Sequence, residues 1–143
     1  MTTGLAVFDS TVQETNLWLK DIEAHLGDGE RHEAYAALRA VLHALRDRLP
    51  AQAAVSFAAQ LPMLVRGLYF EGWTLPDKPM RSHSVQEFAD EVRASLPLRF
   101  KFDPVLCCRA VFRTVAQFTS VDEAQKVMGQ LPASLRELWP RSA

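Results

Sequence analysis

One segment of this chain occurs twice, seventy residues apart. Gln60 to Tyr69 begins with Gln-Leu-Pro and carries arginine at its seventh position, and Gln130 to Trp139 does the same. The same offset aligns the Arg-Ala-Val triplet at 39–41 with the one at 109–111, without a gap across the first long helical segment. Self-similarity at a fixed spacing is the signature of a duplicated structural unit. The repeat therefore predicts a tandem duplication in which both halves share one fold.

Both halves are predicted to be helical. Apolar residues recur at steps of three and four, as from Val12 to Leu26, and no alternating stretch is long enough for a strand. Thr11 with Glu14, and Ser84 with Glu87, have the spacing of a capping box, in which the two side chains bind free amides at the start of a helix. We therefore expect the first helix of each half to begin at these residues.

These signals predict the domain organisation. Residues 1–10 are expected to form a flexible tail, followed by a first repeat at 11–72, a proline-containing linker at 73–83 and a second repeat at 84–139. Each repeat would hold four helices, and residues 11–143 would form a single all-α domain. Two helix quartets with one apolar face each bury those faces most simply by packing about a pseudo-twofold axis into one helical bundle. We expect neither half to be stable alone.

Arginines recur on the long helices of both halves. Arg39 and Arg46 lie opposite the apolar stripe of the first long helix, and Arg109 and Arg113 lie on the second. Two such stripes could straddle a nucleic-acid backbone. The competing interpretation is that they pair with nearby carboxylates such as Asp47 and keep a helix face hydrated.

Arg66 and Arg136 occupy equivalent positions in the repeated segment. An arginine at both positions predicts a shared geometric role, either a bidentate clamp on a carboxylate or on the carbonyls at a helix end, or a ligand contact between the repeats. Trp73 follows the first repeat at the start of the linker. There it is expected either to cover the core or to contact a partner.

No set of reactive residues converges in the sequence. None of the four histidines stands four residues from another, the spacing by which a helix presents two metal ligands on one face. Cys107 and Cys108 are adjacent in a helical segment, a geometry that disfavours a disulfide between them, so we expect buried thiols, with a redox switch as the alternative. No glycine-rich phosphate loop or nucleophile turn is present. The sequence predicts no enzyme, no cofactor and no metal site.

The overall charge adds no pull toward a polyanion. The formal net charge is -1 at pH 7, which favours neither nucleic acid nor an anionic membrane surface. No apolar run approaches the roughly 18 to 20 residues that span a bilayer, and the first ten residues lack a signal-peptide pattern. We expect a cytoplasmic protein without membrane contact.

Two sets of residues resemble a known family. These are the Leu-Pro-x-x-Leu/Val-Arg segments at 61–66 and 131–136, and the segment Leu68-Tyr69-Phe70-Glu71-Gly72-Trp73. Together they resemble the bacterial family named domain of unknown function 2267, over about Val12 to Trp139. The resemblance implies an all-helical bacterial protein with a twofold internal repeat. It brings no activity, cofactor or catalytic residue.

The leading functional hypothesis is a non-catalytic module that contacts a protein partner or a second copy of itself. Nucleic-acid binding through the arginine stripes is the less favoured alternative, and a small-ligand site between the repeats is a third. The candidate contact residues for these hypotheses are Arg66, Arg136, Trp73, Arg39, Arg46, Arg109 and Arg113.

Overall fold

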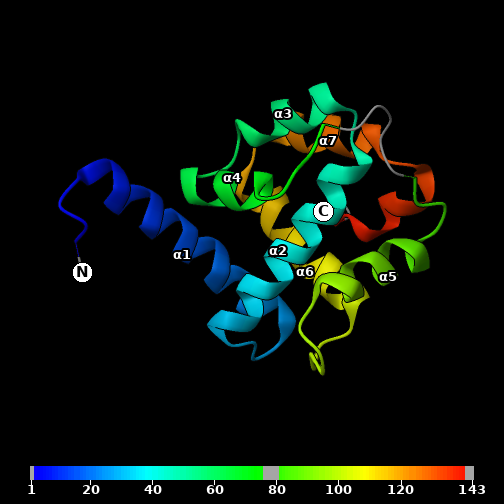
Figure 1. Ribbon diagram of the computed structural model, residues 1–143, viewed down its shortest axis with the longest axis horizontal. Helices are drawn as coiled ribbons and strands as arrows, with labels where there is room; N and C mark the ends of the chain where they lie inside the picture. Colours follow the sequence, from blue (N-terminus) through cyan, green and yellow to red (C-terminus); the bar gives the residue numbers. More distant parts are fainter. Residues whose placement is uncertain (1, 76–80, 141–143) are drawn as a thin grey trace.

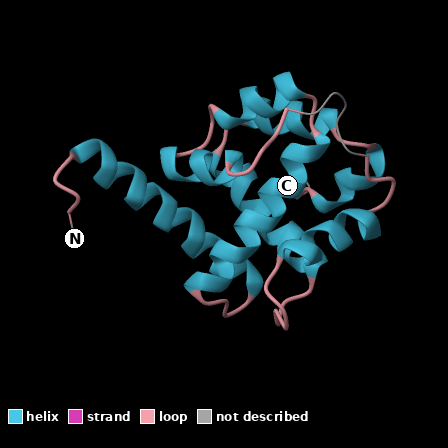
Figure 2. Ribbon diagram, viewed as in Figure 1, coloured by secondary structure: helices cyan, strands magenta, loops and turns pink. Residues whose placement is uncertain are grey.

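The protein is built from helices throughout the part of the chain that the computed structural model describes, residues 2–75 and 81–140 (Figures 1 and 2). The predicted all-α fold is confirmed. No helix among these residues has both the length and the apolarity to cross a bilayer. The helices, in chain order, are α1 (Ala6–Leu26), α2 (Arg31–Arg48), α3 (Ala51–Ala58), α4 (Met63–Phe70), α5 (Val85–Ser95), α6 (Pro104–Phe118), α7 (Val121–Gln130) and the 3-10 helix η1 (Ala133–Leu138).

The two halves pack in matching ways. The helix α2 contacts α1, α4, α5 and α6, and α6 contacts α5, η1, α1 and α2. Several contacts correspond under the repeat: α1–α2 corresponds to α5–α6, α1–α6 to α2–α5, and α1–α4 to α5–η1. The equivalent helices α3 and α7 pack against each other, as do α2 and α6. These pairings are those that a pseudo-twofold axis requires, and the origin of the repeat in a duplication stays a prediction.

One hydrophobic core joins the two halves. Leu38, Val41 and Leu45 of α2 are fully buried, and Cys108, Val111 and Val115 occupy the equivalent positions of α6. These residues form the apolar stripes that the three- and four-residue spacing predicts. The helices therefore bury their stripes against a shared interior.

The first helix begins earlier than the sequence predicts. It starts at Ala6, five residues before Thr11, so residues 6–10 are helical and the predicted capping box at Thr11 and Glu14 is wrong. Thr11 instead lies within α1, where its side chain is buried. Its Oγ1 accepts a hydrogen bond from the amide of Leu64 at 3.0 Å. The hydroxyl thus binds a free amide in the first turn of α4, a different helix from the expected one.

The predicted helix start at Ser84 is confirmed, and other helix ends also have local caps. Ser84 Oγ accepts from the amide of Glu87, and Ser120 Oγ accepts from that of Glu123, each at 3.1 Å. Asp103 caps α6 with Pro104 in its first turn. Gly27 ends α1 with a φ of 76°, a conformation that glycine adopts without a steric cost.

The repeated prolines have the same backbone conformation. Pro62 has φ and ψ of -54° and 151°, and Pro132 has -53° and 145°, each directly before a helix. The leucines that precede them, Leu61 and Leu131, are both buried. The segments then differ, because α4 is an α-helix whereas η1, the eighth helix in chain order, is a 3-10 helix.

Candidate functional site

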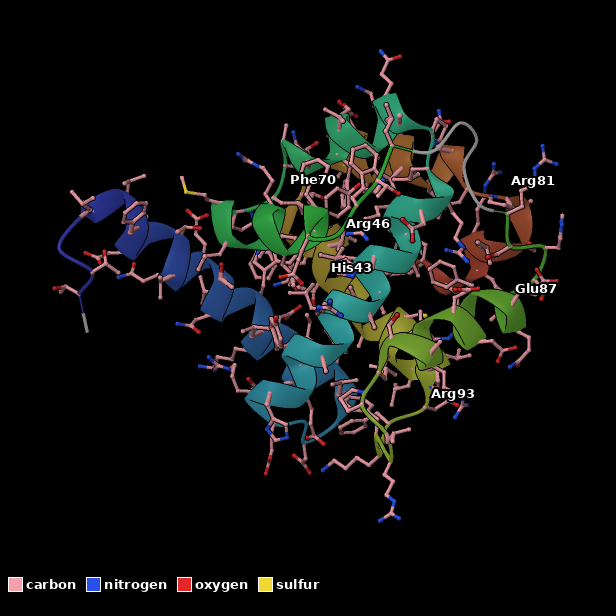
Figure 3. The ribbon with its side chains drawn as sticks, viewed as in Figure 1. His43, Arg46, Phe70, Arg81, Glu87 and Arg93 are labelled. Atoms are coloured by element: carbon pink, nitrogen blue, oxygen red, sulfur yellow. The ribbon has the colours of Figure 1, made fainter. Side chains whose placement is uncertain are left out.

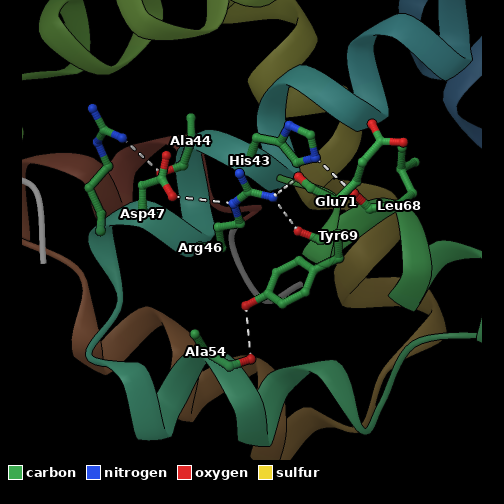
Figure 4. A network of polar contacts seen from close by, with 9 residues as sticks. His43, Ala44, Arg46, Asp47, Ala54, Leu68, Tyr69 and Glu71 are labelled. Carbon is green, nitrogen blue, oxygen red and sulfur yellow. Dashed lines mark hydrogen bonds and ion pairs between the residues drawn. The ribbon is translucent and has the colours of Figure 1, made fainter. Parts of the chain in front are cut away.

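A polar network closes the C-terminal end of α4 (Figure 4). Arg46 of α2 donates from Nη1 to the carbonyls of Tyr69 and Glu71, both at 2.7 Å, and from Nε to Asp47 at 3.2 Å. The Tyr69 hydroxyl donates to the carbonyl of Ala54 in α3 at 2.9 Å. The last carbonyls of a helix lack partners within the helix and carry a partial negative charge, so a guanidinium is well suited to them. The network joins α2, α3 and α4.

His43 belongs to the same network. Its Nε2 lies 2.8 Å from the carbonyl of Leu68, a contact that requires Nε2 to carry the proton. Burial lowers the pKa of His43 below its usual range, and the positive charges of Arg46 and Arg39 lower the pKa further. The carbonyl of Leu68 opposes this shift. The neutral imidazole therefore serves as a hydrogen-bond donor inside the fold.

The predicted pair of exposed arginine stripes does not form as expected. Arg46 is only 7% exposed, so its assignment to a solvent-facing stripe is wrong. Arg39 lies at the surface and pairs with Glu71 at 3.2 Å. Arg109 donates to the carbonyl of Glu137 at 3.0 Å, and Arg113 is exposed on the same side of α6. The two long helices thus present unequal basic surfaces.

Arg66 and Arg136 bind helix-end carbonyls in the same way. Arg66 donates from Nε to Ala58 and from Nη2 to Leu61, both at 3.0 Å. Arg136 donates from Nε to Met128 at 3.2 Å and from Nη2 to Gly129 at 3.5 Å. Ala58 and Met128 are themselves seventy residues apart. The arginines therefore hold the ends of α3 and α7, one of the two clamps that the repeat predicts.

Trp73 lies against the core. It is half-buried, and its ring centroid is 5.4 Å from that of Phe70. Phe70 in turn contacts Tyr69 edge-on at 5.0 Å. Of the two predicted roles, the structure places Trp73 in the one that covers the core. Most of the predicted linker that follows it, residues 76–80, lies outside the described residues.

Arg48 is a buried residue that the sequence analysis did not single out. It donates from Nε to Ser82 Oγ at 2.6 Å and from Nη1 to the carbonyl of Ala44 at 3.0 Å. Its guanidinium also lies 5.6 Å from the ring centroid of Phe88 in α5. Burial lowers its pKa, and Glu91 opposes that shift. Arg48 therefore links α2 of the first half to the beginning of the second.

The cysteines are poorly suited to reactive chemistry. Cys107 and Cys108 are free and fully buried. Burial raises the pKa of Cys107 to about 12 and also raises the pKa of Cys108. Since the thiolate is the reactive form, both thiols are held in the unreactive one. Among the described residues, no group of three or more His, Cys, Asp or Glu side chains is placed to hold a metal ion.

Two hollows matter for the ligand hypotheses. One, of about 320 Å³, lies between α3 and α7, where the two halves meet, and is lined in part by Pro50, Ser56 and Lys126. Neither Arg66 nor Arg136 lines this hollow. The other, of about 370 Å³, lies between α6, α7 and the end of η1, and His25 of α1 also lines it.

The N-terminal part of α1 extends beyond the rest of the molecule (Figure 1). Its apolar side chains, together with two at the beginning of α4, remain between 37% and 55% exposed. We call this surface the α1 face. It consists of Leu5, Val7, Phe8, Val12, Met63 and Leu64.

These features define an all-helical protein of two similarly packed halves, with a polar network in one half and a hollow in the other. The family described as "Uncharacterized conserved protein (DUF2267)" matches residues 15–138. The chain belongs to that family, as the repeated segments suggest. No curated protein matches the chain.

Proposed function

We propose that this protein is a non-catalytic module that self-associates through the α1 face. The observation that carries the proposal is the apolar stripe of α1, which continues past the body of the protein. Leu5, Phe8, Val12, Thr15, Leu19, Ile22 and Leu26 follow one another at alternating steps of three and four residues.

This spacing is that of the seam between two paired helices. The C-terminal part of the seam, at Leu19, Ile22 and Leu26, is buried against the rest of the chain. The N-terminal part, at Leu5, Phe8 and Val12, has the same pattern and is exposed. A second helix laid along it would continue the packing that the core already uses.

The size of the α1 face supports a second copy as the occupant. Six large apolar side chains at about half exposure present on the order of 500 Å². A standard interface buries about 800 Å² per partner, and homodimer interfaces are about 65% apolar, so the two areas agree. A twofold dimer brings the same surface of each copy together. The α1 face is suited to this because it consists of uncharged side chains.

Sedimentation velocity over a range of protein concentrations tests the proposal. We expect the native chain to shift from the monomer mass of 16.1 kDa to twice that value. The double variant Phe8→Glu, Val12→Glu should stay monomeric with an unchanged circular dichroism spectrum. Leu98→Glu is the matched control, because Leu98 is 97% exposed on a different surface. A native chain that stays monomeric throughout contradicts self-association, and the α1 face would then be available to a different protein.

Nucleic-acid association remains the second hypothesis of the sequence, and the burial of Arg46 weakens it. Binding would depend on Arg39, Arg109 and Arg113 alone. A mobility shift at low salt with these three changed to glutamine distinguishes the hypotheses, since specific contacts to phosphate would be lost in the variant.

A further inference from the structure

We propose that the hollow between α6, α7 and η1 binds a small organic carboxylate with an apolar body. This site goes beyond the proposed self-association and lies on a different surface. The polar network of Arg46 and Tyr69 occupies the equivalent place in the first repeat (Figure 4).

Five of the ten residues that line the hollow are the repeat equivalents of network residues. Arg113, Ala116, Gln117, Ala124 and Trp139 follow His43, Arg46, Asp47, Ala54 and Tyr69 by seventy positions each. In the first repeat the long side chain of Arg46 occupies this space and binds two carbonyls. In the second repeat alanine stands at the equivalent position. The hollow of about 370 Å³ therefore lies at a position where the first repeat has a buried arginine and the second has alanine.

Most of the wall is apolar. Ala116, Val121, Ala124 and Met128 line it together with the ring of Trp139. Trp139 is held in place by Phe112, whose ring centroid is 5.1 Å away. The volume lies within the range of about 300 to 1,000 Å³ that is typical of small-molecule sites. A ligand with an aliphatic or aromatic body is suited to this wall.

The charge at the rim selects an anion. Arg113 lines both this hollow and a neighbouring polar hollow that also contains Arg109 and Glu137. Arg109 uses one donor group on the carbonyl of Glu137. His25, also at the rim, lies 3.3 Å from Asp21, which accepts from Thr114 at 2.6 Å, so the Asp21 carboxylate already has partners. Among the described residues that line the hollow, Arg113 is the arginine at the mouth, and a guanidinium pairs with a carboxylate through two parallel hydrogen bonds.

Octanoate is the probe for this site, and 1-octanol is its uncharged counterpart. Isothermal titration calorimetry should show one octanoate bound per chain, with 1-octanol at least about tenfold weaker because it lacks the charge that Arg113 recognises. Two-dimensional NMR of the amide groups should place the octanoate response at α6 and α7.

Three variants locate the binding. Ala116→Leu fills the hollow and should abolish octanoate binding, and Arg113→Gln should weaken it at least about tenfold. Arg93→Gln is the matched control and should bind as the native chain does, because Arg93 lies on α5 (Figure 3) and lines a separate hollow. Arg113 is exposed, so Arg113→Gln should leave the fold intact. This variant therefore tests the site even if Ala116→Leu is destabilised.

Several results would overturn the proposal. They are the absence of heat at millimolar octanoate, equal affinity for 1-octanol, unchanged binding in both Ala116→Leu and Arg113→Gln, and an NMR response confined to the α1 face or to the residues around Arg93. The last of these would show that octanoate binds to exposed apolar surface in general.

Discussion

The ends of α4 and η1 are equivalent in the repeat and differ in what closes them. At the end of α4, a buried arginine and a neutral histidine bind three backbone carbonyls. At the end of η1, Ala116 and the exposed Arg113 stand in their places, and a hollow remains. The backbone at Pro62 and Pro132 is nearly the same, and the segments then differ both in helix type and in the side chains that surround their ends. Two similarly packed halves can thus surround equivalent helix ends with different side chains.

The largest expected effect concerns the end of α4, which the buried Arg46 closes. Arg46→Ala removes a buried cation and leaves the carbonyls of Tyr69 and Glu71 without it, so we expect unfolding to become easier by about 3 kcal/mol. Urea denaturation followed by circular dichroism measures the change. Arg113→Ala, on the equivalent part of α6, should cost less than about 0.5 kcal/mol because it is a surface substitution. Similar losses in the two variants would show that the halves are closed in the same way.

A smaller effect should separate the two helix-end clamps. The bonds of Arg66 are 3.0 Å long and partly buried, whereas those of Arg136 are 3.2 and 3.5 Å long and exposed. We therefore expect Arg66→Ala to cost about 1.5 kcal/mol and Arg136→Ala about 0.5 kcal/mol. The melting temperatures of the two variants show which substitution costs more stability. An unchanged melting temperature for Arg66→Ala would rule out a stabilising clamp at that position.

The smallest effect concerns pH and only the first repeat. Because the folded protein lowers the pKa of His43, the unfolded chain takes up a proton at a higher pH than the folded protein does. Stability from this residue is therefore complete above the unfolded pKa of about 6.5 and falls as the pH drops from there toward the lower folded pKa. Urea unfolding at several pH values between neutral and mildly acidic measures the slope.

His43→Gln is the control for this pH effect. Glutamine can donate to the carbonyl of Leu68 without titrating, so the variant should lose stability less steeply with falling pH. A slope equal to that of the native chain would assign the pH dependence to other groups. The second repeat has the permanently charged Arg113 at the equivalent position and adds nothing to this slope.

The sequence predicted the helices well where their signals are local. Ser84, Asp103 and Ser120 cap the helices that they precede, and Gly27 ends α1. These ends depend on side chains and amides only a few residues apart. The start of α1 was misplaced because Thr11 with Glu14 resembles Ser84 with Glu87. Five further residues continue α1 beyond Thr11, and in that setting the hydroxyl turns to another helix.

The site was harder to predict because it depends on distant partners. Arg46 looked like a surface arginine from its place opposite the apolar stripe, yet its acceptors are 23 and 25 residues away. Arg48 was missed for a similar reason, since its partner Ser82 is 34 residues away. One signal could have shown Arg46 to be internal. The equivalent residue is Ala116, which is uncharged, so the two long helices do not repeat a basic residue at this position.

The hydroxyl of Thr11 has a wider consequence for α4. Pro62 precedes this eight-residue helix and supplies no side-chain cap, so the threonine of α1 provides the acceptor at its beginning. Side chains of α2 hold its other end. Side chains of the neighbouring helices thus bind both ends of this short helix. A force that tilts the projecting arm of α1 would act directly on one of those contacts.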